Sequence, residues 1–453
     1  MAENNNIPKH WQIKNLHDVC KELQSGKRPK GGVQGIESGT PSIGAEHLNY
    51  NGGFKFEKIK FVPKEYAEQM RRGVIKKDDI IVVKDGATTG KTSFVGNDFP
   101  FEFAVINEHV FIVRLTEYIL PKFAFYKLFS STGHKEVLED FRGAAQGGIS
   151  SGFLDKVKIP IPPLTEQQTI VSKIEELLSA LENGKQQLQT AQQQLKAYRQ
   201  SLLKWAFEGK LTRLNHDLSD LHDEHDLNMA AESQIEYIKN QGSDKLPEGW
   251  KWVKTGDIID TINNGYTPTK EYLSQGSGEI PFIKVYNLNF DGTLNFKKNP
   301  TFIPDAIHKK ELKRSICVAG DVLINIVGPP LGKVSIVTNQ FPEWNINQAI
   351  VLFRPNEKIL SKYISYFLQN PVTINWLEGT SKATAGQWNV KVSTCRVIPF
   401  PIPPIEEQHL IIQELESKLT VCDKIEETIS HSLQQAETLW QSILKKAFEG
   451  RLV

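Results

Sequence analysis

Apolar residues in two stretches of this chain recur in alternating steps of four and three positions. The first series runs from Ile170 to Trp205, with Gly184 as an interruption near its middle. The second runs from Ile411 to Ile443 and is interrupted at Lys418. This spacing places apolar side chains on one face of an α-helix and is typical of coiled coils. The pattern therefore predicts two long amphipathic helices.

The two stretches are copies of one another. Residues 160–212 and 401–453 align at a constant offset of 241 positions, and both begin with PIPP and end with an AFEG sequence. Because prolines interrupt the helical hydrogen-bond ladder, they mark the helix starts, and we expect Thr165 to be an N-cap with Gln168 completing a capping box. Gly209 and Gly450 stand where a left-handed C-terminal residue is expected. Each helix should then be about 60 Å long.

Helices of this length exceed what a small domain can cover. We therefore expect the two apolar seams to pack on each other as a coiled coil. The alternative is that each helix packs only on its own domain. The residues expected at the helix contact are Ile170, Ile174, Leu177, Leu181, Leu188, Leu195, Leu202, Ile411, Leu415, Ile425, Ile429 and Ile443.

Short β-type apolar runs dominate the remaining sequence. DDIIVVK, EHVFIVRL, DVLINIV and QAIVLFRP alternate with turns rich in Gly, Pro and Asn, and helices are expected near residues 123–129 and 363–368. The segments before the two helices also repeat each other weakly, since Pro8 and Trp11 match Pro247 and Trp250. Each segment is predicted to be an α+β domain with a curled, mostly antiparallel sheet.

The predicted order is domain, helix, domain, helix. We place the first domain at residues 1–158, the first helix at 159–212, a polar acidic linker at 213–245, the second domain at 246–399 and the second helix at 400–453.

The composition limits the functional classes. The formal net charge of +1 gives no global attraction to nucleic acid, so DNA binding would need local basic loops. The four cysteines form no CxxC pair, which fits a reducing cytoplasm. No apolar run approaches the length of a membrane span. We expect a cytoplasmic protein that is not embedded in a membrane.

Three catalytic patterns fail on inspection. Gly86–Lys91 resembles a phosphate-binding loop but is one residue short, and its counterpart GPPLGK has prolines where backbone donors would be needed. Asp305 and Glu311-Leu312-Lys313 resemble the carboxylate–lysine pattern of metal-dependent nucleases, but the gap is short and no second carboxylate pair is evident. No NPPY-like tetrapeptide of a base methyltransferase is present. We expect no catalytic residue, metal site or cofactor in this chain.

Basic and amide side chains gather instead in Gly- and Pro-rich loops. Lys and Arg attract phosphates, while Asn, Gln and Arg can bond to base edges. We expect DNA contacts from loops 27–30, 84–92 and 142–151 and from their counterparts 264–270, 328–333 and 382–389. The candidate DNA-binding residues are Lys27, Arg28, Lys30, Lys84, Thr88, Thr89, Lys91, Arg142, Gln146, Ser150, Tyr266, Thr267, Lys270, Lys333, Lys382, Thr384, Gln387 and Asn389.

The duplicated order of these motifs resembles the specificity subunit of type I restriction-modification systems. The resemblance rests on the PIPP…EQ starts at 160–167 and 401–408, the AFEG[KR]L ends at 206–211 and 447–452, the LPxxW start at 246–250 and the G-x-x-P turns at 26–29 and 265–268. It covers nearly the whole chain.

The resemblance implies an α+β fold with two target recognition domains, separated by two long helices that pack as an antiparallel coiled coil. Each domain would recognise one half of an asymmetric, bipartite site in double-stranded DNA, and the helices would set the spacer. It further implies two modification (methyltransferase) subunits that use S-adenosylmethionine, and motor-nuclease restriction subunits that use ATP and magnesium. The competing interpretation is a coiled-coil scaffold for protein interactions that does not bind DNA directly. A nuclease or NTPase would instead show cleavage or turnover by the purified chain.

Overall fold

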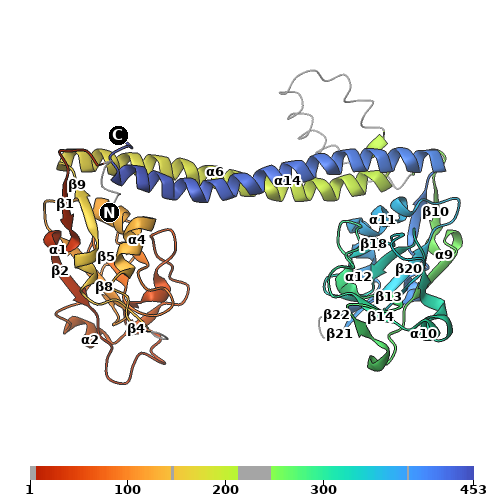
Figure 1. Ribbon diagram of the computed structural model, residues 1–453, viewed down its shortest axis with the longest axis horizontal. Helices are drawn as coiled ribbons and strands as arrows, with labels where there is room; N and C mark the ends of the chain where they lie inside the picture. Colours follow the sequence, from red (N-terminus) through yellow and green to blue (C-terminus); the bar gives the residue numbers. More distant parts are fainter. Residues whose placement is uncertain (1–6, 144–146, 213–245, 385–386) are drawn as a thin grey trace, which may run out of the picture. The chain divides into compact units, whose positions relative to one another are not determined.

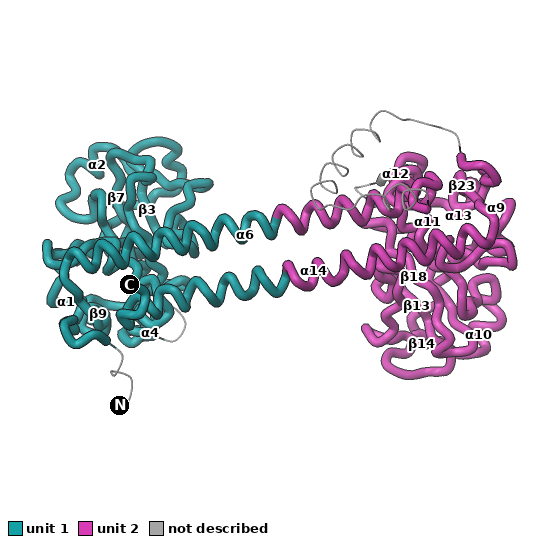
Figure 2. Tube along the Cα trace, turned by 90° about the horizontal axis from the view of Figure 1, so that it is seen from above, with its two compact units in different colours: residues 1–189, 430–453 teal, residues 190–429 magenta. Residues whose placement is uncertain are grey.

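The computed structural model describes residues 7–143, 147–212, 246–384 and 387–453. The chain divides into two compact units (Figure 2). Unit 1 comprises residues 1–189 and 430–453, and unit 2 comprises residues 190–429. Each unit thus combines one globular domain with the start of one long helix and the end of the other. The expected linker at 213–245 lies outside the described residues.

The domain of unit 1 is built around an antiparallel sheet with the strand order β2–β8–β5–β6, of which β2, β5 and β8 are labelled in Figure 1. One of its two inner strands, β5 (Ile80–Val83), is buried along its whole length. Because side chains alternate across a strand, Ile80 and Val82 join the core cluster beneath helix α3 (Pro121–Phe129), whereas Ile81 and Val83 join a cluster on the opposite face. A continuous apolar run suits a strand that is covered on both faces.

The remaining elements of unit 1 complete this two-sided core. A second sheet has the order β4–β3–β7, in which β3 and β7 are parallel. The bounds are β1 Gln12–Asn15, α1 Leu16–Val19, β2 Cys20–Ser25, β3 Thr40–Ile43, β4 Lys60–Val62, α2 Lys64–Glu68, β6 Thr92–Phe94, β7 Val105–Ile106, β8 Val110–Leu115, α4 Ser131–Leu138, α5 Phe153–Lys156 and β9 Lys158–Ile161.

The domain of unit 2 repeats this plan. Its four-stranded sheet has the order β11–β20–β16–β18, a five-stranded sheet has the order β12–β14–β13–β19–β15, and β13 and β19 are parallel. The bounds are β10 Lys251–Lys254, α9 Thr255–Ile258, β11 Thr261–Asn264, β12 Ser274–Gln275, β13 Ile280–Ile283, β14 Thr301–Ile303, α10 Asp305–Lys310, β15 Ile316–Cys317, β16 Val322–Asn325, β17 Val327–Gly328, β18 Val334–Ile336, β19 Trp344–Ile346, β20 Ile350–Arg354, α11 Ser361–Gln369, α12 Pro371–Gly379, β21 Lys382–Thr384, β22 Gln387–Asn389, α13 Val392–Cys395 and β23 Pro399–Ile402.

The prediction of two mostly antiparallel α+β domains is confirmed. The four apolar runs become β5, β8, β16 and β20, and the expected helices near 123–129 and 363–368 become α3 and α11. The difference is that each domain holds several small sheets rather than one curled sheet.

The two long helices are α6, Leu164–Phe207, and α14, Ile405–Phe448, with 44 residues each. In unit 1 the start of α6 and the end of α14 share one core cluster, to which Ile174 and Leu444 belong. In unit 2 the end of α6 and the start of α14 share another, to which Leu202 and Leu415 belong. In both units the start of one helix therefore lies beside the end of the other. The antiparallel pairing is confirmed.

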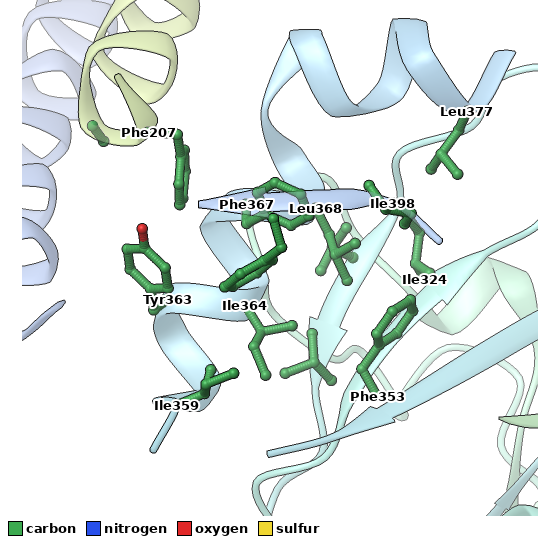
Figure 3. Close-up of a cluster of buried hydrophobic side chains, with 14 of the residues drawn as sticks. Phe207, Ile324, Phe353, Ile359, Tyr363, Ile364, Phe367, Leu368, Leu377 and Ile398 are labelled. Atoms are coloured by element: carbon green, nitrogen blue, oxygen red, sulfur yellow. The ribbon is translucent and has the colours of Figure 1, made fainter. Parts of the chain in front are cut away.

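The helices also pack on the domains: the end of α6 packs on the domain of unit 2, and the end of α14 packs on that of unit 1. The alternative that each helix packs only on its own domain is therefore wrong. The Phe207 ring at the end of α6 lies 5.0 Å from that of Tyr363 and 5.5 Å from that of Phe367 (Figure 3). In unit 1 the corresponding Phe448 ring lies 5.1 Å from that of Phe123. Since AFEG carries this phenylalanine in both copies, the repeated motif reflects a repeated contact between a helix end and a domain.

The predicted seam is partly wrong on α14. Of the residues predicted at the contact, Ile425 is 43% exposed, whereas the buried residues Cys422, Ile429, Ala436 and Ile443 follow one another at intervals of seven positions. Beside Ile425, Arg199 of α6 forms ion pairs with Asp423 at 2.7 Å and Glu426 at 2.9 Å. Ion pairs at the surface therefore join the two helices near Ile425, where an apolar contact was expected. On α6, Leu177, Leu181 and Leu188 are half-buried.

The helix ends match the sequence better than the helix starts. Gly209 and Gly450 have φ of +68° and +65°, as predicted for left-handed C-terminal residues. At the start, however, the Pro163 carbonyl already accepts from the N–H groups of Glu166 and Gln167 at 2.9 Å. Thr165 therefore lies inside the helix, and the predicted capping box is wrong.

A buried glutamine explains the EQ motif. Gln167 is 1% exposed; its Oε1 accepts from Leu120 N at 2.8 Å, and its Nε2 donates to Pro162 O at 2.9 Å and Tyr118 O at 3.2 Å. Gln408, which is fully buried, makes the equivalent three bonds to Leu360, Lys358 and Pro403. Each glutamine fastens the start of a long helix to the loop before α3 or α11.

A hollow of about 770 Å³ in unit 1 lies where the seam of α6 is interrupted. Gly184 lines it together with Leu181, Leu188 and Ala436, and a Cβ added at Gly184 would meet no atom within 4 Å. Since glycine within a helix costs about 1 kcal/mol relative to alanine, we expect Gly184→Ala to raise the free energy of unfolding by about that amount. Denaturant unfolding measures this. A matched Gly209→Ala variant should destabilise, because φ is +68° and the Cβ would lie 2.1 Å from Pro247.

Candidate nucleic-acid interface

The G-x-x-P turns place the first candidate loop of each unit against a strand end. A Cβ added at Gly26 would lie 1.8 Å from the Ile106 carbonyl oxygen, and one at Gly265 would lie 2.0 Å from that of Ile346. Only glycine permits such a close approach of two backbones. In both units this turn therefore holds the following loop, at 27–30 or 266–270, next to the segment after β7 or β19.

The second and third candidate loops of unit 1 are joined by backbone pairing. Asp85 and Gly148 form an antiparallel bridge, and Arg142 bridges the same glycine. Ile149 N donates to Lys84 O at 2.8 Å. Loops 84–92 and 142–151, which are far apart in sequence, therefore lie side by side.

Side chains connect the first loop to this pair. Arg28 Nε lies 2.8 Å from Glu108 Oε1, and the next residue, His109, contacts Asp85 through Nδ1 at 2.5 Å. Lys84 N donates to His109 O at 2.8 Å. The three predicted loops are thus linked to one another, and the second and third line a cavity of about 1230 Å³ through Asp85, Thr89 and Gly147.

A buried carboxylate anchors the third loop. Asp140 accepts from Ser150 N and Oγ, both at 2.7 Å, and from Arg142 at 3.0 Å. Burial opposes ionisation of this carboxyl, but the bonds from Ser150 and the Arg142 charge outweigh it, so the pKa of Asp140 is lowered. The carboxylate form is therefore the one that orders the loop.

Unit 2 builds the same convergence with different side chains. Ile326 N donates to Ala349 O at 2.8 Å and Val390 N to Ile326 O at 2.9 Å, which are the counterparts of the bonds at Lys84. β17, β22 and β21 form a small sheet where unit 1 has its isolated bridges. The Thr267 hydroxyl donates to Gln348 Oε1, in the place of the Arg28–Glu108 ion pair. The backbone arrangement is retained while the chemistry changes.

The predicted residues occupy several environments. Lys27, Arg28, Lys30, Arg142, Ser150, Tyr266, Lys270 and Asn389 are exposed, and Lys84, Thr88, Thr267 and Lys333 are half-buried. Lys382 and Thr384 lie on β21 and Gln387 on β22. Gln146 lies outside the described residues.

Two predicted contacts are used by the fold itself. Thr89 is 8% exposed, and its hydroxyl donates to Gly86 O at 2.7 Å within its own turn. Lys91 Nζ donates to Leu48 O at 2.8 Å and lies 4.9 Å from the centre of the Tyr50 ring. Burial, followed by repulsion from Lys55, lowers the pKa of Lys91. The turn does not present this lysine freely, because its ammonium group holds two loops together.

The sequence interpretation sought cations and missed the acidic and imidazole groups of the cavity. Glu46, Asp85, His109 and His134 all line it, and Glu108 lies beside His109. The sequence does contain a signal for these groups. Asn107 aligns with Asn347, and the residues that follow are Glu108 and His109 in the first copy but the uncharged Gln348 and Ala349 in the second.

The described residues contain no group of three or more His, Cys, Asp or Glu side chains that could hold a metal ion. The nuclease-like Asp305 instead pairs with Lys309 on α10, at 2.9 Å. Among the described helices, none is both long and apolar enough to cross a membrane.

Comparison with known proteins yields a consistent set of relatives. The Escherichia coli type I restriction enzyme EcoBI specificity subunit is 27% identical over 431 residues, which cover 93% of this chain and 84% of that protein. The type I restriction enzyme MjaVIII specificity subunit of Methanocaldococcus jannaschii is 21% identical over 467 residues, covering 98% of this chain and 94% of that protein.

Solved structures share the fold. The HsdS subunit from Thermoanaerobacter tengcongensis matches with a TM-score of 0.62 and 19% identity over the full length of both chains. A chain solved in a study of assembly and conformational transition of the type I R-M system matches with a TM-score of 0.70 and 19% identity, covering 98% of this chain and 99% of that one. Residues 8–190 and 247–435 both match the family described as type I restriction modification DNA specificity domain. The chain therefore belongs to this family and carries two copies of its domain.

Proposed function

We propose that this chain is the sequence-specific DNA-recognition subunit of a type I restriction-modification complex. Each domain recognises one half of an asymmetric, bipartite site in double-stranded DNA, and the paired helices set the spacer. The chain itself performs no chemistry. S-adenosylmethionine, ATP and magnesium are used by the partner subunits.

One observation carries this proposal. The two domains keep the same convergence of three loops but exchange its side chains, with Arg28–Glu108 in unit 1 and Thr267–Gln348 in unit 2. A retained backbone with altered polar groups is what two readers of different base sequences require, because base identity is read by side-chain hydrogen bonds. A scaffold that binds one partner twice would favour retained side chains.

Exposed cations around the loops support binding to phosphate. Lys27, Lys30 and Arg142 are exposed in unit 1, and Lys270 is exposed in unit 2. With a net charge of +1 for the whole chain, such local clusters rather than a global field would supply the electrostatic attraction. Each half-site alone would be held weakly, and joining the two readers in one chain raises the apparent affinity.

The helices also offer surface for partner subunits. Leu410, Val421, Ile425 and Leu439 of α14 are each at least 43% exposed. Relatives of this chain are named as subunits of restriction enzymes. We propose that two modification subunits dock along the helices and that motor-nuclease restriction subunits join them.

A gel-shift titration tests the DNA-binding part of the proposal. The full chain, alone and together with co-purified modification subunits, is mixed with genomic DNA fragments over a range of salt concentrations. Binding that weakens steeply with salt is expected, because phosphate contacts release counterions. Tight, salt-insensitive association with partner proteins and no DNA shift would favour the protein-interaction scaffold.

Lengthening both helices tests the spacer. One extra heptad after Gln189 in α6 and another after Ile429 in α14 would keep the apolar register and add about 10 Å to each helix. At 3.4 Å per base pair, the spacer between the half-sites should grow by about three base pairs, while both half-sites stay the same. Mapping of methylated sites in a host that carries the lengthened chain measures this. Retention of the original spacer would contradict the role of the helices.

A further inference from the structure

A row of charged side chains runs from the first candidate loop of unit 1 to the cavity, which its last two members, His109 and Asp85, line. Glu108 Oε1 lies 2.8 Å from Arg28 Nε and 3.3 Å from His109 Nε2, and the other ring nitrogen of His109 lies 2.5 Å from Asp85 Oδ1. All four side chains are between 33% and 39% exposed. The row therefore lies at the surface, where the three candidate loops meet, and not in the core.

The fold does not need these charges. Unit 2 forms the same backbone bonds around Ile326 with neutral residues throughout: Val327 stands at the place of Asp85, and Ala349 at that of His109. Since a valine and an alanine suffice to build the convergence, the carboxylate and the imidazole of unit 1 serve another purpose than stability.

Asp85 is the carboxylate of this row that a ligand in the cavity can reach. Both contacts of Glu108, with Arg28 and His109, fall on Oε1, and its Oε2 is buried. Glu46, which also lines the cavity, is bound by Lys60 at 2.5 Å. Among the described residues, Asp85 has His109 as its side-chain partner. An ionised carboxylate offers about four acceptor positions, so Asp85 can accept further bonds from a ligand in the cavity.

A carboxylate on a DNA-binding surface discriminates between sequences. Phosphates repel it, so it weakens binding to every sequence unless it meets a donor. In the major groove those donors are the exocyclic amino groups of cytosine and adenine. We infer that Asp85, positioned by His109, is a specificity-determining residue of unit 1 that accepts a hydrogen bond from such an amino group. This inference rests on the proposed function.

The test transfers the neutral residues of unit 2 into unit 1. Full complexes carrying Asp85→Val with His109→Ala, or Asp85→Asn, which keeps the shape, are compared with wild type by mapping methylated sites in a host genome. Both changes should relax the preference at one base pair of one half-site by about 10- to 100-fold. The other half-site and the spacer should stay unchanged. Val327→Ala in unit 2 is the matched control and should leave the half-site affected by Asp85 intact.

The outcomes separate the two proposals. Both Asp85 variants methylating the wild-type motif with unchanged preference would overturn the inference, as would an equal loss at both half-sites, which indicates a structural defect. In either case a bipartite motif for the wild-type complex upholds the proposed function. A wild-type complex that neither binds DNA nor methylates a bipartite site would overturn the proposed function itself.

Discussion

Replacing Asp79 with alanine should lower the free energy of unfolding of unit 1 by about 3–5 kcal/mol, as expected when one partner of a buried ion pair is removed. The Asp79 side chain is 2% exposed, and Arg114 binds it with two hydrogen bonds, from Nε at 2.7 Å and from the second guanidinium nitrogen at 2.9 Å. Arg114 also donates to the Val74 carbonyl at 2.6 Å. Without the carboxylate, the guanidinium keeps its place in the sheet but loses its buried counter-charge.

The neighbouring residue Glu22 provides the control. It contacts the same guanidinium at 3.0 Å, but its side chain is 44% exposed. Glu22→Ala should therefore have only a small effect, because water screens the contact. Denaturant unfolding gives the total loss, and hydrogen–deuterium exchange of β5 and β8 assigns it to unit 1. Equal losses for the two variants would show that burial does not set the strength of this pair.

The same pair recurs in unit 2, where Arg354 binds Asp321 at 2.7 and 2.9 Å. The sequence repeat already aligns Asp79 with Asp321, and both arginines close an apolar run. What the sequence does not provide is the pairing, because residues 79 and 114 meet only through the order of the strands in the sheet. The fold was predictable as far as its signals are local, which covers the β-runs, α3, α11 and the glycine helix ends.

The candidate site was likewise predictable only where its signals are local. The glycine- and lysine-rich loops can be recognised from local composition, and the three loops of each unit do converge. Their shared acidic row could not be found locally, because Arg28 and Glu108 are 80 positions apart and Asp85 and His109 are 24 apart. The predicted seam on α14 was partly wrong for a related reason, because a contact between two helices is not visible in the sequence of either one. Spacing alone does not show that Arg199 of α6 forms ion pairs with Asp423 and Glu426, on either side of Ile425 in the sequence.

Replacing Gln167 with glutamate should cost unit 1 about 3–5 kcal/mol at neutral pH, which is the range for an uncompensated buried charge. The Nε2 group of this fully enclosed side chain donates to two carbonyl oxygens, those of Pro162 at 2.9 Å and Tyr118 at 3.2 Å. In the variant a carboxylate oxygen, which cannot donate, would face both of these carbonyl oxygens. Because three main-chain groups converge on this one side chain, the start of α6 should detach from the loop before α3.

The penalty should also depend on pH, since protonation restores a donor toward those carbonyls. Burial among acceptors raises the pKa of the introduced carboxyl above its unfolded value. The variant should therefore recover stability as the pH falls through the raised pKa, and lose it again as the pH rises. Gln168→Glu is the adjacent control, because Gln168 is exposed and its charge would remain in water. Unfolding of both variants between pH 4 and pH 8, in roughly the range that a raised carboxyl pKa would span, measures the difference. If the two variants lost the same stability at every pH, the fastening role of the motif glutamine would be wrong. The start of α6 would then be held in place by the apolar cluster around Ile170 and Ile174 alone.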